Sequence, residues 1–275
     1  MNVGLLTVFP RFFEGPLEEG MVRIARRDGK LNVQVVDLRD HTDDIHRTTD
    51  DTQYGGGAGM VMKCDPILRA IEALPADYRG RIFLTSARGR RFDEPLAREL
   101  AQGGGFTVIC GRYKGVDERV IALTGAEEVS IGDYILSGGE PAALVMLDAA
   151  IRHVPGVLGD YDSAVEDSFY NGLLGYPVYT RPEEYRGMNV PEVLMSGHHA
   201  RIEAWRRQEA LKATWQRRRD LLDAYVRGGN TLSREDRKLL VELERQSARA
   251  ADGGTGAGGT GAGGKGEGHE SPAND

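Results

Sequence analysis

The sequence predicts an α/β domain with a largely parallel sheet, followed by a small helical domain. Over the first 150 residues, short apolar runs rich in Val and Ile alternate with helical patterns, which is typical of parallel strands joined by helices. Residues 198–225 and 233–247 then show sustained helical periodicity. The last 23 residues contain 10 glycines, and such a segment cannot bury a core.

Within the first domain, the expected strands are the five apolar runs VGLLTVF (3–9), LNVQVVDL (31–38), RIFLTSA (81–87), FTVICG (106–111) and EEVSIGDYIL (127–136). The expected helices lie around residues 17–27 and at PILRAIEAL (66–74), LARELA (96–101) and ERVIAL (118–123). A longer helix is expected at residues 140–154, because Pro141 stands near its start and Pro155-Gly156 follows its end.

Composition changes three times after this helix. We expect the first domain to cover residues 1–160, an interdomain linker residues 161–176, a helical domain residues 177–248 and a disordered glycine-rich tail residues 249–275. The linker contains three nearby acids, Asp162, Glu166 and Asp167, which is more than a spacer requires. In the helical domain, Ser233 with Asp236 three residues later predicts the N-cap of the last helix.

Charge is unevenly distributed along the chain, although the net charge is −7. Residues 1–175 carry 19 Lys and Arg against 27 Asp and Glu, whereas residues 176–250 carry 15 against 11. A basic second domain is compatible with a polyanionic partner. We expect a cytoplasmic protein, because the sequence has no signal peptide and no apolar run long enough to span a bilayer. Cys64 and Cys110 are expected to be structural thiols.

Glycines cluster at three places where expected strands end: YGGGAGM (54–60), CGRYKG (110–115) and IGDYILSGGE (131–140). Glycine permits tight turns and close approach of the backbone to a ligand. None of the three clusters contains a G-x-G-x-x-G fingerprint, and no P-loop motif occurs, which argues against a dinucleotide-dependent dehydrogenase and a P-loop ATPase.

These clusters, together with RHVPGVLG (152–159), EDSF (166–169) and YTRPEEYRGMNVPEVLMSGHHARIEAWR (179–206), occur in the order and spacing of one family. From Met1 to about residue 245 the sequence resembles the bacterial tRNA (guanine-N1)-methyltransferase family. The resemblance implies a SPOUT-type parallel sheet with a C-terminal trefoil knot, a topology that composition would never suggest. It also implies a homodimer with active sites built from both chains, and methylation of N1 of guanosine 37, next to the anticodon, with the tRNA anticodon stem-loop as partner.

The resemblance further implies S-adenosyl-L-methionine as cofactor, leaves room for magnesium near the site, and requires no protein-bound metal. The family's cofactor pocket falls on Thr85, Ser86, Ala87, Gly111, Gly115, Ile131, Gly132, Asp133, Tyr134, Ile135, Leu136, Gly138 and Gly139. Adenine needs backbone partners and an apolar slot, which Tyr134, Ile135 and Leu136 can supply.

The catalytic residues that the resemblance implies are Asp167 and Arg152. Guanine N1 carries a proton at neutral pH, so methylation there needs a base within hydrogen-bond reach, and Asp167 matches the family's base. Arg152 would stabilise the charge that spreads onto O6. Glu166 competes for the role of Asp167. Lys114 departs from the family, which usually has an acid there: Lys114 faces solvent or an RNA phosphate, or the acid's role passes to Asp117 or Glu118.

Two other functions remain open from the sequence: a tRNA ribose 2′-O-methyltransferase of the same superfamily, and an RNA-binding relative without catalysis. Arg217, Arg218 and Arg219 beside Trp215 could hold an RNA backbone and a stacked base, or form a solvated face beside a core tryptophan. The six histidines do not have the spacing of a metal-ligand set.

Overall fold

A computed structural model describes residues 1–158 and 166–253 of the chain, with side chains up to Arg249. Asp162, the first part of the expected linker and most of the glycine-rich tail lie outside these residues. The chain forms two compact units, of which the first covers Met1–Tyr170 and the second begins at Asn171.

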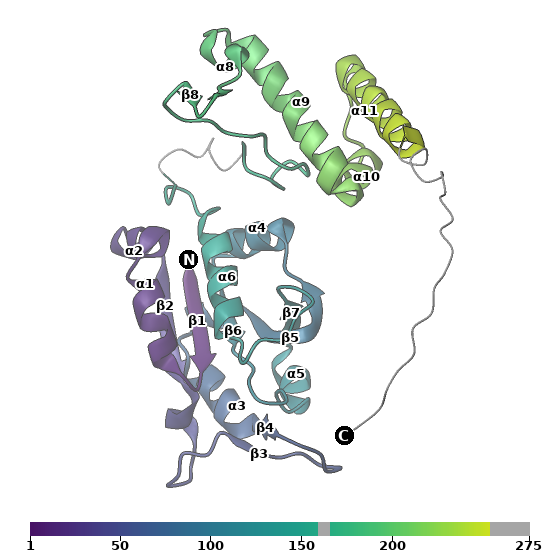
Figure 1. The fold of residues 1–275 in the computed structure, drawn as a ribbon. Coiled ribbons are helices and arrows are strands. Elements are labelled where there is room, and N and C mark those ends of the chain that lie inside the picture. The colour runs from purple at the N-terminus through teal and green to yellow at the C-terminus, as the bar shows by residue number, and fades with distance from the viewer. Residues whose placement is uncertain (159–165, 254–275) are drawn as a thin grey trace, which may run out of the picture. The chain divides into compact units, whose positions relative to one another are not determined.

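The first unit contains a five-stranded parallel sheet in the order β2-β1-β6-β5-β7. Its strands are β1 (Asn2–Thr7), β2 (Asn32–Asp37), β5 (Arg81–Arg91), β6 (Gly105–Ile109) and β7 (Glu127–Ser130). Each overlaps one of the five apolar runs, so the prediction of an α/β fold with a largely parallel sheet is confirmed (Figure 1).

Among the described residues of this unit, the α-helices are α1 (Glu14–Leu17), α2 (Gly20–Arg27), α3 (Cys64–Ala73), α4 (Glu94–Gln102), α5 (Arg119–Thr124) and α6 (Glu140–Ile151). The same residues include the short 3₁₀ helices η1 (Pro10–Phe13), η2 (Leu38–His41) and η3 (Ala76–Tyr78). The helix expected at 140–154 is confirmed in α6, which has Pro141 in its first turn and ends four residues before Pro155.

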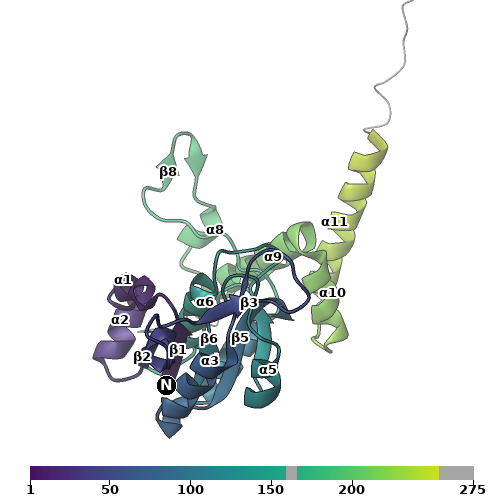
Figure 2. The same cartoon turned by 90° about the horizontal axis from the view of Figure 1, so that it is seen from below.

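The sheet is buried on both faces, because successive side chains of a strand point to opposite sides. Leu5 packs with α2, α4 and α6 on one face, whereas Leu6 packs with α3 and α5 on the other. Both side chains are fully buried. The unit is therefore a three-layer α/β/α sandwich (Figure 1, Figure 2).

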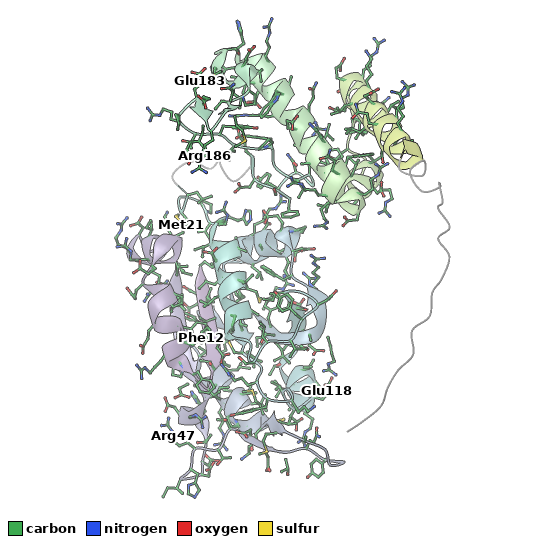
Figure 3. All side chains as sticks on the ribbon, viewed as in Figure 1. Phe12, Met21, Arg47, Glu118, Glu183 and Arg186 are labelled. Atoms are coloured by element: carbon green, nitrogen blue, oxygen red, sulfur yellow. The ribbon has the colours of Figure 1, made fainter. Side chains whose placement is uncertain are left out.

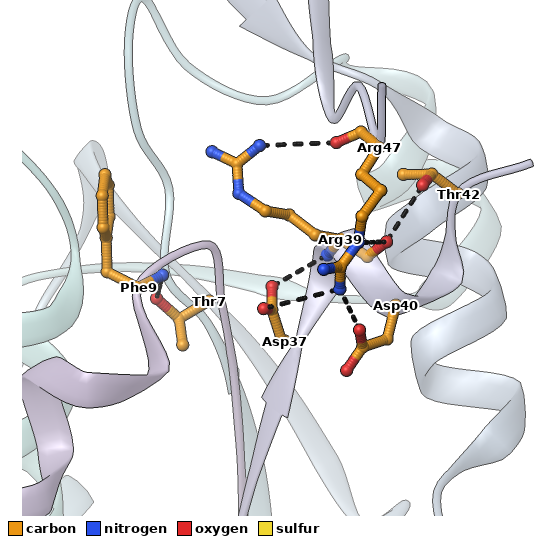
Figure 4. Close-up of polar contacts among 7 residues, drawn as sticks. All are labelled: Thr7, Phe9, Asp37, Arg39, Asp40, Thr42 and Arg47. Carbon is orange, nitrogen blue, oxygen red and sulfur yellow. Dashed lines mark hydrogen bonds and ion pairs between the residues drawn. The ribbon is translucent and has the colours of Figure 1, made fainter. Parts of the chain in front are cut away.

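The polar glycine-rich stretch after β2 contains an antiparallel pair that the sequence did not predict, β3 (Asp50–Thr52) with β4 (Met60–Met62). Its strands are three residues long, too short for an alternating apolar pattern to emerge. Before this pair, Arg47 forms ion pairs with Asp37 and Asp40 and so ties the loop to the end of β2 (Figure 4).

The second unit contains helices α8 (Glu192–Met195), α9 (His199–Arg217), α10 (Arg219–Arg227) and α11 (Arg234–Gly253), with a small hairpin of β8 (Glu184–Tyr185) and β9 (Met188–Asn189). Figure 2 shows the hairpin projecting away from the three longer helices. Leu173, Leu211 and Leu222 form the buried centre of this unit.

The sequence predicted one helical segment over residues 198–225, but the helix breaks at Arg218, whose φ of −142° and ψ of 65° are not helical. The break lets the chain turn so that Leu222 on α10 packs against Leu211 on α9. Arg218 pairs with Asp220 across it at 2.7 Å. Both sides of the break are helical as predicted, but the spacing of apolar residues cannot reveal one non-helical residue between them.

The predicted cap of the last helix is confirmed. The Asp236 backbone N–H donates to the Ser233 hydroxyl at 3.0 Å, and the Ser233 N–H donates to the Asp236 carboxylate at 3.1 Å. This reciprocal pair satisfies two backbone donors at the start of α11. None of the described helices is long and apolar enough to cross a membrane.

Candidate cofactor pocket and catalytic pair

A cavity of about 440 Å³ lies at the carboxyl edge of the sheet in the first unit. Three adjacent parallel strands contribute to it: the second half of β5, the loop after β6 and the loop after β7. Ligands of open parallel sheets characteristically bind beyond the carboxyl ends of the strands. The three segments include two of the three glycine clusters singled out in the sequence.

Twelve of the thirteen residues expected to hold the cofactor line this cavity. They are Thr85, Ser86, Ala87, Gly111, Gly115, Ile131, Gly132, Tyr134, Ile135, Leu136, Gly138 and Gly139. The remaining one, Asp133, lies on the same loop but not in the lining. The fold thus gathers segments up to 54 positions apart, from Thr85 to Gly139, around one space.

The loop after β7 closes against the loop after β6 through its two terminal glycines. The Gly139 N–H donates to the Gly111 carbonyl at 2.9 Å. A Cβ at Gly138 would come within 2.5 Å of Arg112 and of Glu140, and one at Gly139 would collide with the Thr85 hydroxyl. Both positions therefore require glycine because of close approach.

Thr85 links the strands at the floor of the cavity. Its hydroxyl accepts a hydrogen bond from the Gly111 N–H at 3.1 Å and donates one to the Ile109 carbonyl at 3.2 Å. A single side chain on β5 thereby fixes the point where the chain leaves β6.

Arg112 and Glu140 form a second link beneath the cavity. Glu140, the first residue of α6, is fully buried. Its carboxylate accepts from Arg112 Nε at 3.0 Å and from the Thr7 hydroxyl at 2.7 Å, and it pairs with a second Arg112 nitrogen at 2.9 Å. The Thr7 hydroxyl also accepts from the Phe9 N–H at 2.9 Å (Figure 4).

Arg112 connects this buried carboxylate to the rim of the cavity. Its guanidinium donates to the Ser137 carbonyl at 3.3 Å and lies over the Phe9 ring, 4.2 Å from the ring centroid. Neither Arg112 nor Glu140 was predicted as a site residue from the sequence. The available signal was an acid at the start of a mostly apolar helix, because a buried acid requires a partner.

We expect Glu140→Ala to lower the free energy of unfolding by about 3 kcal/mol, because the mostly buried Arg112 guanidinium would lose its counterion. Urea unfolding followed by circular dichroism measures this change. Asp148→Ala, on the same helix at an exposed position, is the matched control and should change stability by less than about 0.5 kcal/mol. Equal stability of wild type and Glu140→Ala would contradict this interpretation of the pair.

Lys114 lines the cavity, and its aliphatic stem passes close to Gly59 in the glycine-rich loop before β4. Of the two acids considered for the missing carboxylate, Asp117 does not line the cavity. Its carboxylate makes two hydrogen bonds to Arg119, at 2.9 and 2.7 Å, which hold its pKa far below the ordinary value.

Glu118 does line the cavity (its side chain is labelled in Figure 3). It shares Arg88 with Glu128, at 2.8 and 3.1 Å. Both acids raise the pKa of Arg88, so this group stays charged. Among the described residues, no three His, Cys, Asp or Glu side chains come together as a metal site.

The proposed catalytic residues meet at a second, smaller cavity. This cavity has a volume of about 270 Å³, and Arg152 and Asp167 form an ion pair in its wall. The other lining residues are Glu94, His153, Ser168 and Phe169. Asp167 and Arg152 are each about half exposed. Glu166 does not line this cavity.

The two cavities share no residue and lie toward opposite ends of α6. Gly139 at the N-cap belongs to the first, and Arg152 at the C-cap belongs to the second. A helix of 12 residues is about 18 Å long at 1.5 Å per residue. Within one chain the pair is therefore too far from the first cavity for its carboxylate to act on a ligand bound there.

In the second unit, two of the three consecutive arginines are engaged in ion pairs. Arg218 pairs with Asp220, and Arg219 pairs with Glu244 at 2.8 Å. The Arg219 guanidinium also lies over the Trp215 ring, 5.1 Å from its centroid, and Trp215 packs against the leucine cluster of this unit. The interpretation of Trp215 as a core residue fits these contacts better than a base-stacking platform.

The fold and the first cavity define the chain as a parallel α/β protein with a cofactor-sized site at the carboxyl edge of its sheet. The family model described as tRNA (Guanine-1)-methyltransferase TrmD matches residues 1–224. The chain therefore belongs to the tRNA (guanine-1)-methyltransferase family.

Individual relatives cover nearly the whole chain. A tRNA (guanine-N(1)-)-methyltransferase of Geobacter metallireducens is 50% identical over 250 residues, which is 90% of this chain and 100% of the relative. Proteins of the same name from Carboxydothermus hydrogenoformans and Dictyoglomus turgidum are 51% and 46% identical, over 87% and 90% of this chain and 92% and 98% of their own lengths.

Proposed function

We propose that this chain methylates N1 of guanosine 37, next to the anticodon of tRNA, with S-adenosyl-L-methionine as methyl donor. The observation that carries the proposal is the cavity at the carboxyl edge of β6, β5 and β7, built from the segments expected to hold this cofactor. The name shared by the relatives, tRNA (guanine-N(1)-)-methyltransferase, supports both the substrate and the position methylated.

The residues of the first cavity fit the cofactor. A volume of about 440 Å³ is within the usual range for small-molecule sites. Ile135 and Leu136 offer apolar side chains at its rim, and the glycines leave backbone groups accessible. The cofactor supplies an electrophilic methyl group. The expectation of magnesium has less support, because Glu118 and Glu128 are both paired with Arg88, and we derive no step through a metal ion.

Asp167 would take the proton from guanine N1, because a carboxylate within hydrogen-bond reach can act as general base. Arg152 would hold O6, where negative charge develops as the proton leaves. The ion pair between Asp167 and Arg152 supports these roles, because N1 and O6 of guanine are neighbouring atoms.

Separation of the two cavities along α6 supports a homodimer in which Asp167 and Arg152 of one chain face the cofactor cavity of the other. Exposed Ile135 and Leu136 at the cavity rim would be covered in such an assembly. We also propose the trefoil knot of this superfamily, and the membership of the chain in the family supports it.

We assign residues 1–160 to the methyltransferase domain, residues 161–176 to the linker and residues 177–248 to a helical domain that grips the anticodon stem-loop. The excess of 15 Lys and Arg over 11 Asp and Glu in residues 176–250 supports RNA binding by the helical domain. Arg186, which is labelled in Figure 3, lies over the exposed ring of Tyr185 in the β8–β9 hairpin. We place the enzyme in the cytoplasm, with its substrate.

The test is methyl transfer from labelled cofactor to two tRNA transcripts that differ only at position 37. Guanosine should be methylated and adenosine should not, and nucleoside chromatography should identify 1-methylguanosine. Recovery of 2′-O-methylguanosine instead would support the ribose methyltransferase. Binding of tRNA without binding of the cofactor would support a non-catalytic RNA-binding protein.

A further inference from the structure

The segment that carries Asp167 is attached to the rest of its unit through Tyr170. The Tyr170 ring lies under the Arg98 guanidinium, whose carbon is 4.4 Å from the ring centroid. On another side it stacks with His153, with centroids 6.3 Å apart and an interplanar angle of 30°. Arg98 also donates a hydrogen bond to the Tyr170 carbonyl at 2.7 Å.

Both partners of Tyr170 are themselves held by Glu94 at the start of α4. The His153 Nε2 lies 2.9 Å from a Glu94 oxygen, and Arg98 Nε lies 3.9 Å from the same atom. The His153 side chain is only 6% exposed. These contacts form a rigid base for Tyr170, built from α4 and the end of α6.

The neutral form of His153 is favoured in this arrangement. Burial lowers its pKa, and the nearby cations Arg98 and Arg152 act in the same direction, while Glu94 acts against them. The neutral ring donates through Nε2 to Glu94 and leaves Nδ1 buried without a hydrogen-bond partner. A second proton at Nδ1 would find no acceptor, so the neutral, stacked form is favoured.

A tight turn transmits the position of Tyr170 to Asp167. The Tyr170 N–H donates to the Asp167 carbonyl at 3.4 Å. Phe169 within the turn has a φ of 74°, a left-handed conformation that is costly for a residue with a side chain and persists only where the surroundings enforce it. An exposed ion pair such as Asp167 with Arg152 would not by itself fix the segment.

We propose that Tyr170, clamped by Arg98 and His153, is a positioning residue that holds the Asp167 carboxylate in its place beside Arg152. The proposal rests on the assignment of Asp167 as general base. Misplacement of a reacting group by about 1 Å can lower a rate by about 10²-fold, so a clamp of this kind affects turnover strongly. Because the clamp lies at the far end of α6 from the first cavity, it should leave cofactor affinity unchanged.

The experiment compares Tyr170→Ala with Tyr170→Phe in the full chain. Tyr170→Ala should lower kcat for tRNA methylation at least about tenfold, while the KM for tRNA and the calorimetric Kd for the cofactor change little. Tyr170→Phe keeps the ring contacts and the carbonyl acceptor and should retain most of the activity. Arg98→Ala removes the clamp from the other side, should reproduce the loss of kcat, and provides a second route if Tyr170→Ala does not fold.

A double-variant comparison distinguishes positioning from a general structural effect. In an Asp167→Asn background, Tyr170→Ala should cause no further loss in single-turnover rate, because the group that it positions is gone. Wild-type kcat in both Tyr170→Ala and Arg98→Ala, or an equal further loss in the Asp167→Asn background, would overturn the proposal. The proposed function is judged separately, by whether the wild type forms 1-methylguanosine.

Discussion

Asp167→Asn is expected to lower the rate constant for methyl transfer to tRNA by about 10³-fold, within the range that general-base catalysis supplies. Asparagine has nearly the same shape but cannot accept the N1 proton. None of residues 166–170 lines the first cavity, where we propose that the cofactor binds. The affinity of the variant for S-adenosyl-L-methionine should therefore equal that of the wild type. Single-turnover kinetics with labelled cofactor measure the first quantity, and isothermal calorimetry measures the second.

Glu166→Gln is the matched control, because Glu166 is the acid next to Asp167 in the sequence but does not line the second cavity. The substitution removes its charge. It should leave the rate within about threefold of wild type, as for a surface change away from the reacting atoms. If Glu166→Gln instead removes activity and Asp167→Asn does not, the two acids exchange roles. If both variants remain active, neither is the base.

The parallel sheet could be predicted from the sequence mainly because its central strands β1 and β6 are buried on both faces and therefore appear as apolar runs. In the run EEVSIGDYIL, only the first four of the ten residues form a strand. β7 ends at Ser130, and the apolar residues Tyr134, Ile135 and Leu136 that follow lie exposed at the cavity rim. Apolar character alone does not distinguish a core residue from an exposed residue that binds a ligand or a partner chain.

The candidate site likewise contains some residues that could be predicted from the sequence and others that could not. Gly138 and Gly139 could be predicted because neighbouring atoms come too close for any side chain, so the sequence has glycine at these positions. Tyr170 and Arg98 could not, because their contact joins positions 72 apart and depends on how α4 packs beside the end of α6. The location of Asp167 far from the cofactor cavity also has no local signal, since it depends on the length and direction of α6.

The second large effect concerns heterodimers. We expect a heterodimer of one Asp167→Asn chain and one Gly139→Ala chain to regain about half of the wild-type activity, although each variant alone is inactive. In the proposed dimer each active site takes its cofactor cavity from one chain and its base from the other. One of the two sites then combines the intact cavity of the Asp167→Asn chain with the intact Asp167 of the other chain.

Gly139→Ala suits this test because its backbone φ of −83° accepts alanine, so the effect is local. The added Cβ would displace the Thr85 hydroxyl, which holds Gly111 at the cavity floor, and cofactor binding should be lost. Heterodimers are obtained by co-expression with two different tags and sequential affinity purification, and their activity is compared with that of each homodimer.

A second heterodimer, with both substitutions on one chain, tests the same arrangement of sites, and it should lose the activity that the first heterodimer regains. A wild-type chain paired with a chain that carries both substitutions should be inactive, because each site then contains one defective half. If sites instead lie within single chains, the wild-type chain keeps a complete site, and this heterodimer retains half of the activity while the first one has none. Since α6 separates the cavity from the ion pair by about 18 Å within a chain, we expect activity only in the first arrangement.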